Sequence, residues 1–226
     1  MCFSASASFI AGTSLSAIGV ATLKKAKVRA ELPFAMIPLL FGVQQLIEGV
    51  IWLTFDHDAT LLKQTMTYLY SGFSHVLWPV YVPFAMGFLE TVRWRKKAIF
   101  AFGVVGVAVS LYLLYFIVTR PVIAEVIGKH IVYVSPHFYQ IPVMALYLAA
   151  TCVSCLYSSH GFVKLFGVLM FVSFTAAYLV HVMALVSIWC FFAAILSLLI
   201  YLHLRFRHLG GFPKSMRLRR PSAAVV

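Results

Sequence analysis

Hydrophobic residues fill long stretches of this chain, and polar residues are concentrated in the short gaps between them. A helix needs about 20 apolar residues to cross a bilayer. Stretches of about that length cover residues 3–23, 32–54, 64–89, 98–118, 139–158, 165–187 and 187–205. The pattern therefore predicts an all-α, polytopic transmembrane helix bundle of about seven spans.

Two of these stretches have irregular features. The third holds Pro79 and Pro83, which predicts a kink, because proline removes a hydrogen bond from a helix interior. The segment that connects the last two stretches is very short and lies around Val186 to Ile188. That short connection predicts a tight antiparallel pair.

The composition supports a membrane protein. Of the 226 residues, 62% are hydrophobic and 11% are charged, whereas a soluble domain has roughly a quarter of its residues charged. A soluble fold of this size could not hide so much apolar surface, so lipid must be part of the solvent. We expect one seven-helix transmembrane domain over residues 1–209 and a flexible, basic cytoplasmic tail over residues 210–226.

The distribution of Lys and Arg predicts the orientation. None of the 18 lies in the interior of a predicted span, Arg205 being the last residue of its span, and all but Lys63, Arg120 and Lys129 fall on one side of the membrane. Cytoplasmic loops carry the excess of Lys and Arg. We therefore expect the N-terminus outside, the C-terminus in the cytoplasm and a multi-pass protein of the cell membrane. Trp52 and Trp189 would then lie at the outer interface and Trp94 at the inner one.

The net charge of +12 predicts some partners and excludes others. Basic residues at the cytoplasmic face predict attraction to anionic lipids. No basic stretch is interleaved with aromatics on a polar background, so nucleic acid is not expected. No Lys lies in a span, so a retinal Schiff base is excluded. Three of the four cysteines fall inside apolar runs, which argues against a disulfide scaffold.

The loop from Arg120 to His137 is the longest on the outer side. It contains a stretch rich in Val and Ile, between Val122 and Val134. We expect this stretch to form a short re-entrant or interfacial segment over the mouth of the bundle.

Glu48 is the one acidic residue inside a predicted span. An ionisable group at such a position is costly and is a functional-site hypothesis by default. Gln44 and Gln45 precede it by four and three residues, so all three side chains lie on one helix face. The second span therefore carries a polar stripe.

Other polar groups are expected near Glu48. At a rise of 1.5 Å per residue, Glu48 and His181 both lie roughly 7–8 Å outward of the membrane centre, and His75 lies near it. Ser71 is one turn outward of His75 on the same face. A pocket in the outer half of the bundle would bring these groups together, with substrate-binding candidates Gln45, Ser71, Tyr178 and His137.

The chemistry of these residue types suggests a metal site. Glu48, His75 and His181 supply carboxylate and imidazole, which bind zinc and other divalent transition metals. Cys2 lies next to the N-terminus, which is expected at the same outer face. It would add a thiol and, once Met1 is removed, an α-amino group. Three ligands with an open position would activate water for hydrolysis, with Glu48 and Cys2 as catalytic candidates. No HxxxH or HExxH is present.

Two resemblances bear on this interpretation. The opening Met-Cys-Phe-Ser-Ala, the segment Phe-Gly-Val-Gln-Gln-Leu-Ile-Glu-Gly at 41–49 and Trp52 resemble an uncharacterised family of bacterial integral membrane proteins. That likeness implies no reaction. The spacing of Ser71 and His75 is similar to the SxxxH element of the superfamily of alkaline ceramidases and adiponectin-type receptors. That superfamily implies seven helices and a buried zinc site, but this chain lacks its HxxxH on the last span.

Three functions remain open from the sequence. The first is a metal-dependent hydrolase acting on a lipid or small apolar substrate. The second is a proton- or cation-coupled transporter or channel that uses Glu48 with His75 or His181. The third is a seven-helix receptor or accessory membrane subunit.

Overall fold

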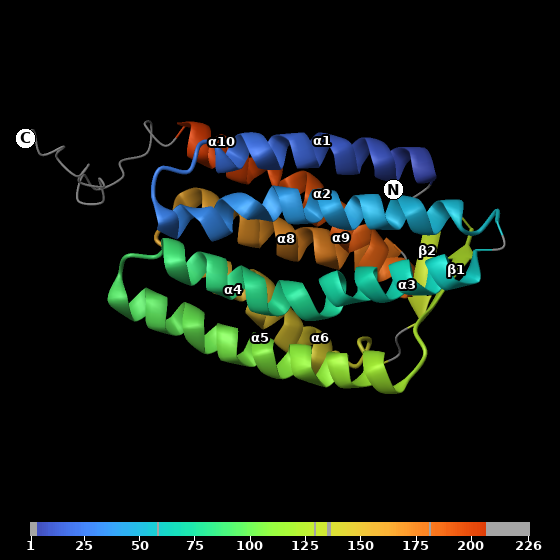
Figure 1. Cartoon of the computed structure of the whole chain (residues 1–226). Helices are drawn as coiled ribbons and strands as arrows, with labels where there is room; N and C mark the ends of the chain where they lie inside the picture. The colour runs from blue at the N-terminus through green and yellow to red at the C-terminus, as the bar shows by residue number, and fades with distance from the viewer. Residues whose placement is uncertain (1–3, 58, 129, 135–136, 181, 207–226) are drawn as a thin grey trace, which may run out of the picture.

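The computed structural model describes residues 4–57, 59–128, 130–134, 137–180 and 182–206, and the helices in this part form one bundle (Figure 1). Within these residues, six helices are long and apolar enough to cross a membrane, and a shorter apolar helix covers Ile141–Leu156. The predicted all-α membrane bundle is therefore confirmed.

Helices α1 (Ala5–Leu23) and α2 (Leu32–Leu53) form a close pair, joined through the 3-10 turn η1 (Arg29–Glu31). The Ser4 Oγ caps α1 by accepting a hydrogen bond from the Ala7 N–H at 3.2 Å. The pair approaches closely at glycines: a Cβ added at Gly19 would lie 2.5 Å from the Leu39 nitrogen. Small residues at helix contacts let backbones pack in lipid, where the hydrophobic effect does not drive helices together.

The third span is one continuous helical element with an irregular centre. It consists of α3 (Thr60–Ser71), a π-helical segment η2 (Gly72–Leu77) and α4 (Trp78–Leu89). Pro79 has no N–H to donate to the carbonyl four residues back. The irregularity predicted from Pro79 and Pro83 thus takes the form of a π-helix just before Pro79.

The remaining spans follow in order. Helix α5 (Arg93–Thr119) is long, whereas the fifth span is short and interrupted, with α6 (Ile141–Leu148), the π-helical η3 (Ala149–Val153) and α7 (Ser154–Leu156). Helix α8 (Gly161–Val180) leads through the 3-10 turn η4 (Val182–Ala184) to α9 (Leu185–Leu196) and α10 (Leu198–Phe206). The connection before α9 therefore ends earlier than the predicted Val186 to Ile188.

The tryptophan prediction is correct only in part. Trp94 is 59% exposed, as expected of an interfacial ring. Trp189 is buried and its Nε1–H donates to the Met170 carbonyl at 3.1 Å. The prediction that Trp189 lies at the interface is therefore wrong, because α9 begins at Leu185 and turns this residue into the bundle.

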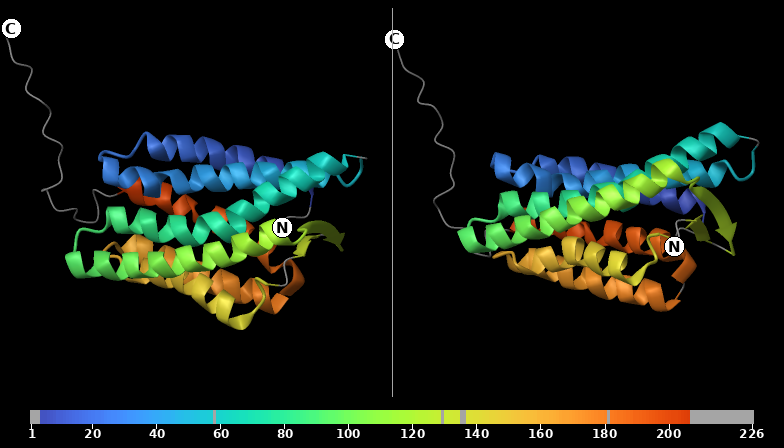
Figure 2. Two further views of the ribbon diagram at one scale, coloured as in Figure 1. Left: turned by 60° about the horizontal axis from the view of Figure 1, so that its bottom comes forward. Right: turned by 90° about the horizontal axis from the view of Figure 1, so that it is seen from below.

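Between α5 and α6, where a short re-entrant or interfacial segment was expected, the chain forms a β-hairpin. Strands β1 (Ile123–Ile127) and β2 (His130–Val134) pair antiparallel, with Ile123 opposite Val134. Gly128 adopts φ 66° in the turn, a conformation that glycine accepts without strain. The β-branched residues that suggested a re-entrant segment also favour strands. The hairpin lies at the end of the bundle where α1 begins (Figures 1 and 2).

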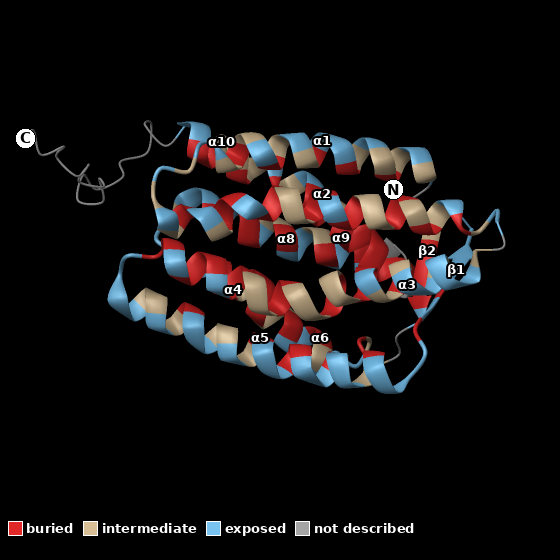
Figure 3. Cartoon of the chain, viewed as in Figure 1, coloured by how far each residue is buried: buried red, intermediate tan, exposed pale blue. Residues whose placement is uncertain are grey.

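Two basic connections lie at the opposite end of the bundle. The α1–α2 and α4–α5 connections are together there, at the end where α10 also finishes (Figure 1). Buried residues line the faces that the helices turn toward one another, and exposed residues cover the outer faces of α1 and α5 (Figure 3). The outer face of α5 is apolar, with Val104 72% and Val118 75% exposed, as expected of a surface that contacts lipid.

Glu90 joins two connections at this basic end. Its Oε1 accepts hydrogen bonds from the backbone N–H groups of Thr91 and Val92, both at 2.9 Å, and from the Ser159 hydroxyl at 2.8 Å. Arg95 adds a bond from Nη1 to the Tyr157 carbonyl at 3.2 Å. These contacts hold the α4–α5 connection against the α7–α8 connection.

We expect the contribution of Glu90 to stability to depend on pH. Burial alone would raise the pKa of Glu90, but the hydrogen bonds from Val92, Ser159 and Thr91 outweigh it and lower the pKa below the ordinary 4.5. A carboxyl with a lowered folded-state pKa stabilises the protein above its unfolded-state pKa, and that contribution disappears as the pH falls through the folded-state value. Thermal unfolding in detergent should therefore show wild type losing its advantage over Glu90→Gln below about pH 4.5. Glu125→Gln on the exposed hairpin is the control, and parallel curves for wild type and Glu90→Gln would contradict the expectation.

Close packing between α4 and α5 yields a second expectation. A Cβ added at Gly106 would collide with the Pro79 carbonyl oxygen, whereas one added at Gly103 would lie 3.6 Å from the Pro83 Cβ. Gly106→Ala should destabilise the protein by about 1–3 kcal/mol or more, since backbone must move. Gly103→Ala should be neutral or slightly stabilising because alanine favours helix. Chemical unfolding of both variants measures the difference, and similar stabilities would refute this account of the crossing.

Candidate functional site

The polar stripe of α2 faces the interior of the bundle. Gln44, Gln45 and Glu48 are each 0% exposed. Their spacing puts them on one side of the helix, and hydrogen bonds from Trp78 of α4 and Ser187 of α9 show that this side faces α4 and α9. The sequence pattern alone would not have told whether the stripe faces protein or lipid.

The Glu48 carboxyl receives hydrogen bonds from three separate elements. Its Oε1 accepts from the Ser187 hydroxyl of α9 at 2.8 Å and from the Tyr133 hydroxyl of β2 at 3.4 Å. Its Oε2 accepts from the Gln45 Nε2–H at 3.3 Å. Glu48 is therefore the point at which α2, the hairpin and α9 are joined by polar contacts.

Tyr133 is held in place by a second aromatic ring. It stacks on Tyr70 of α3, with ring centroids 4.3 Å apart and an interplanar angle of 8°, and both rings are buried. Strand β1 packs on α3, and β2 packs on α9 and η4. The hairpin thus spans from α3 to α9 at its end of the bundle and places Tyr133 against Glu48.

Sequence reasoning did not identify Tyr133 or Ser187. Ser187 is one small polar residue in an apolar run, and Tyr133 belongs to a loop segment that was expected to be interfacial. Their distances in sequence from Glu48 are 139 and 85 residues. No local pattern signals a contact of that kind. Alternation along β2 would not have helped either, because Ile131, Val132 and Tyr133 are all buried.

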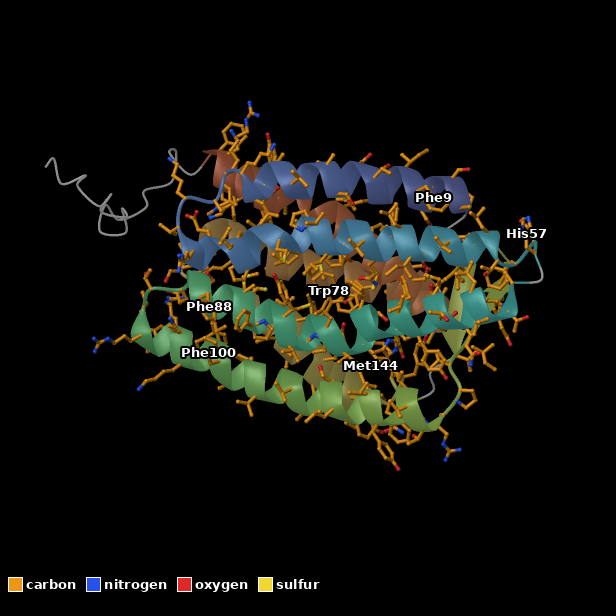
Figure 4. The ribbon with its side chains drawn as sticks, viewed as in Figure 1. Phe9, His57, Trp78, Phe88, Phe100 and Met144 are labelled. Carbon is orange, nitrogen blue, oxygen red and sulfur yellow. The ribbon has the colours of Figure 1, made fainter. Side chains whose placement is uncertain are left out.

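One turn from Glu48 along α2, toward the basic end of the bundle, the polar stripe meets an aromatic layer. The Trp78 Nε1–H donates to the Gln44 Oε1 at 2.7 Å, and the Trp78 ring stacks on Phe41 at 3.9 Å. Trp78 lies in the bundle interior between α2 and α4 (Figure 4). Cys190 of α9 lies beside Gln44 and Glu48.

A small pocket of about 20 Å³ adjoins this layer. A volume of this size holds about one water molecule. Apart from Trp78, Tyr147, Thr151, Trp189 and Cys190, its walls are apolar and consist of Ile37, Phe41, Val82, Phe166, Met170 and Ala193. The polar groups around Glu48 therefore give way to an apolar interior on the side away from the hairpin.

His75 lies in a different environment, in the π-helical segment η2. Its Nδ1 is 2.7 Å from the Ser74 hydroxyl, and its ring meets the Phe138 ring edge-on at 4.9 Å. The residue is 1% exposed. The backbone of Ser71, at the end of α3, also contacts the His75 ring. His75 thus finds its hydrogen-bond partners along its own span and not at Glu48.

Hydroxyl groups satisfy the carbonyls around this π-helix. The Tyr147 hydroxyl donates to the Ser74 carbonyl at 2.5 Å, and the Ser110 hydroxyl donates to the Val76 carbonyl at 2.8 Å. A third bond joins the Ser74 hydroxyl to the Ser71 carbonyl at 3.4 Å. A π-helix changes the ordinary helical hydrogen-bond pattern, and carbonyls in lipid must find partners within the protein. These contacts explain why polar residues occur on α5 and α6 at this depth.

The other predicted site residues lie apart from Glu48 or outside the described part of the chain. His137 stacks on Phe116 at 3.5 Å. Tyr178 is 38% exposed and stacks on Phe174 with centroids 6.3 Å apart. Cys2 and His181 lie outside the described residues.

The metal hypothesis stays a prediction. Across the described ranges, no three His, Cys, Asp or Glu side chains are grouped so that they could hold a metal ion. Of the three proposed ligands, Glu48 and His75 have separate hydrogen-bond partners, and His181 is not described.

Substitutions of Tyr133 separate the roles of its ring and its hydroxyl. Tyr133→Phe keeps the stack on Tyr70 and loses a long hydrogen bond, so we expect a loss of stability of about 1 kcal/mol or less. Tyr133→Ala also removes the buried ring and should cost about 3–5 kcal/mol. Unfolding in detergent compares the two variants. Equal losses would mean that the hydroxyl, and not the ring, holds the hairpin in place.

Comparison with known proteins places the chain in a family without assigning an activity. No curated protein and no solved structure matches it. The comparisons do not bear on the likeness to ceramidases or on a bacterial origin. A family model, described as a family of unknown function, matches residues 1–214. With nearly its whole length matched, the chain belongs to this family, DUF6629.

Proposed function

We propose that the protein is a proton-coupled membrane transporter in which Glu48 takes up and releases the proton. The long apolar helices put the bundle in a lipid bilayer. The observation that carries the proposal is the contact set of Glu48, whose fully buried carboxyl is bonded to groups from α2, β2 and α9.

Each of these partners can serve both charge states of the carboxyl. A carboxylate only accepts hydrogen bonds, whereas a carboxylic acid also donates one. The hydroxyls of Ser187 and Tyr133 can each donate or accept. The Gln45 Oε1 is buried and has no hydrogen-bond partner among the described residues, so a turn of this amide would offer an acceptor to a protonated Glu48. The site therefore suits a group that changes its protonation state.

Protonation of Glu48 would affect more than one element. A charge in the bilayer is costly, and a proton that neutralises it changes which atoms donate and which accept. Because the partners sit on α2, the hairpin and α9, the exchange of donor and acceptor roles acts on all three contacts together. A transporter needs this kind of link between ion binding and helix position.

The surroundings of Glu48 favour access from the hairpin end. On the other side, the aromatic layer of Trp78 and Phe41 and the apolar pocket walls separate the polar groups from the far end of the bundle. The charge distribution predicts that the hairpin end faces outward. We therefore expect Glu48 to exchange its proton with the outer medium.

The hydrolase and receptor hypotheses draw less support from the same site. A metal-dependent hydrolase would need a third ligand near Glu48, and among the described residues none completes a group. No contact of the described residues favours a receptor over a transporter. Attraction of the basic end to anionic lipids remains a part of the proposal that rests on charge alone.

Infrared difference spectroscopy of the reconstituted protein tests the protonation of Glu48. We expect a carboxylic-acid C=O band that appears as the pH is lowered and is missing in Glu48→Gln. Glu125→Gln, at an exposed hairpin position, should keep the band. A spectrum that titrates identically in wild type and Glu48→Gln would refute the proposal.

Proton flux then tests transport. Liposomes that contain the protein and a pH-sensitive dye would be given an outside-acid gradient, with valinomycin and K⁺ to dissipate the membrane potential. Wild type and Glu125→Gln should acidify the interior faster than empty liposomes, and Glu48→Gln should match the empty ones. Equal rates in wild type and Glu48→Gln would show that Glu48 does not carry the proton.

A further inference from the structure

Two buried polar atoms near the centre of the third span have no hydrogen-bond partner in the described part of the chain. The Ser71 Oγ and the His75 Nε2 lack a hydrogen bond to any described residue. Ser71 is 0% and His75 is 1% exposed. Natural proteins rarely leave such atoms unsatisfied, and ordered water is the usual partner where protein atoms are not available.

The two atoms belong to neighbouring side chains. Ser71 ends α3 and His75 lies in η2, four residues later, so the side chains share a helix face. The Nδ1 of His75 is already engaged with Ser74. Nε2 is therefore the ring atom that remains for a ligand, and Ser71 offers a hydroxyl that can donate or accept beside it.

Other hydroxyls in this region are committed elsewhere. Tyr147 and Ser110 bond to carbonyls of η2, and the Ser74 hydroxyl lies against Nδ1. Phe138 covers the His75 ring edge-on. The protein thus satisfies the carbonyls of the π-helix, whereas the Ser71 hydroxyl and the His75 Nε2 have no hydrogen bond among the described residues.

We propose that Ser71 and His75 bind a buried water molecule, and that this water makes His75 a second proton-carrying group near the membrane centre. The first part stands on the two unsatisfied atoms alone, whereas the second rests on the proposed function. A hydronium ion at this position would give its proton to the His75 Nε2 and remain as water on the Ser71 hydroxyl.

Polar side chains lead from this position toward Glu48. Tyr147 contacts the Ser74 carbonyl beside His75. Cys190 lies near Tyr147 on one side and near Glu48 on the other. Tyr147 and Cys190 therefore lie in the region between His75 and Glu48.

Solid-state NMR of the full chain in liposomes tests the water site. With ¹⁵N-labelled histidine, and His75 assigned from the signal missing in His75→Gln, magnetisation transfer from water to the His75 ring is measured. We expect transfer in wild type, its loss in Ser71→Ala, and its retention in Ser110→Ala. Ser110 is the matched control, because it is a buried serine whose hydroxyl is already bonded to the Val76 carbonyl.

Unfolding measurements provide a second readout that needs no assigned spectrum. If water fills the site, Ser71→Ala removes a satisfied hydroxyl and should destabilise the protein, as Ser110→Ala does. If the site is dry, Ser71→Ala removes an unsatisfied hydroxyl and should stabilise it. A stabilised Ser71→Ala, or no water transfer to His75 in wild type, would overturn the water site.

The proton-carrying part is tested by the liposome flux assay on His75→Phe. Slower acidification than in wild type is expected, and an unchanged rate would overturn this part. Water transfer to His75 should persist in Glu48→Gln. A failure of the water site and a failure of the Glu48 proposal are thereby told apart.

Discussion

The hydrocarbon core of a bilayer cannot hydrogen-bond to a protein, and the interior of this bundle is arranged around that constraint. Every polar group at membrane depth must find a partner within the chain or a bound water. The Glu48 carboxyl meets the constraint with partners from three elements. The π-helical segment η2 meets it with hydroxyls of Tyr147 and Ser110. Polar residues in the spans are therefore found where an acid or an irregular backbone needs them.

Hydropathy was sufficient to predict the spans, because crossing a bilayer requires a long apolar segment whatever its neighbours are. The same reasoning singled out Glu48, since a carboxyl in a span is costly anywhere in the membrane. Hydropathy was less reliable for predicting where each span ends. Trp189 was expected at an interface and is buried, because the position of the turn before α9 depends on packing and not on hydropathy.

The partners of Glu48 could not be predicted from the sequence. Tyr133 reaches it only because residues 123–134 form a hairpin that packs between α3 and α9. Ser187 reaches it because α9 turns that side inward. Depth along the membrane normal can be counted from residue numbers, but the rotation of each helix about its axis cannot. Depth placed His75 near the membrane centre and left open that it faces Phe138 rather than Glu48.

Because Glu48 and His75 have different surroundings, a change in the charge of each would have different effects. Glu48 is bonded to elements far apart in sequence, so a change in its charge alters contacts that hold the hairpin and α9 to α2. The hydrogen bond of His75 is to the adjacent Ser74, so a change in its charge acts first on its own π-helix. A proton that moved from Glu48 to His75 would therefore first affect the contacts between α2, the hairpin and α9. It would then affect the centre of the third span alone. Two atoms at these positions, the Gln45 Oε1 and the His75 Nε2, have no hydrogen bond among the described residues, and contacts that only hold the bundle together leave them without a role.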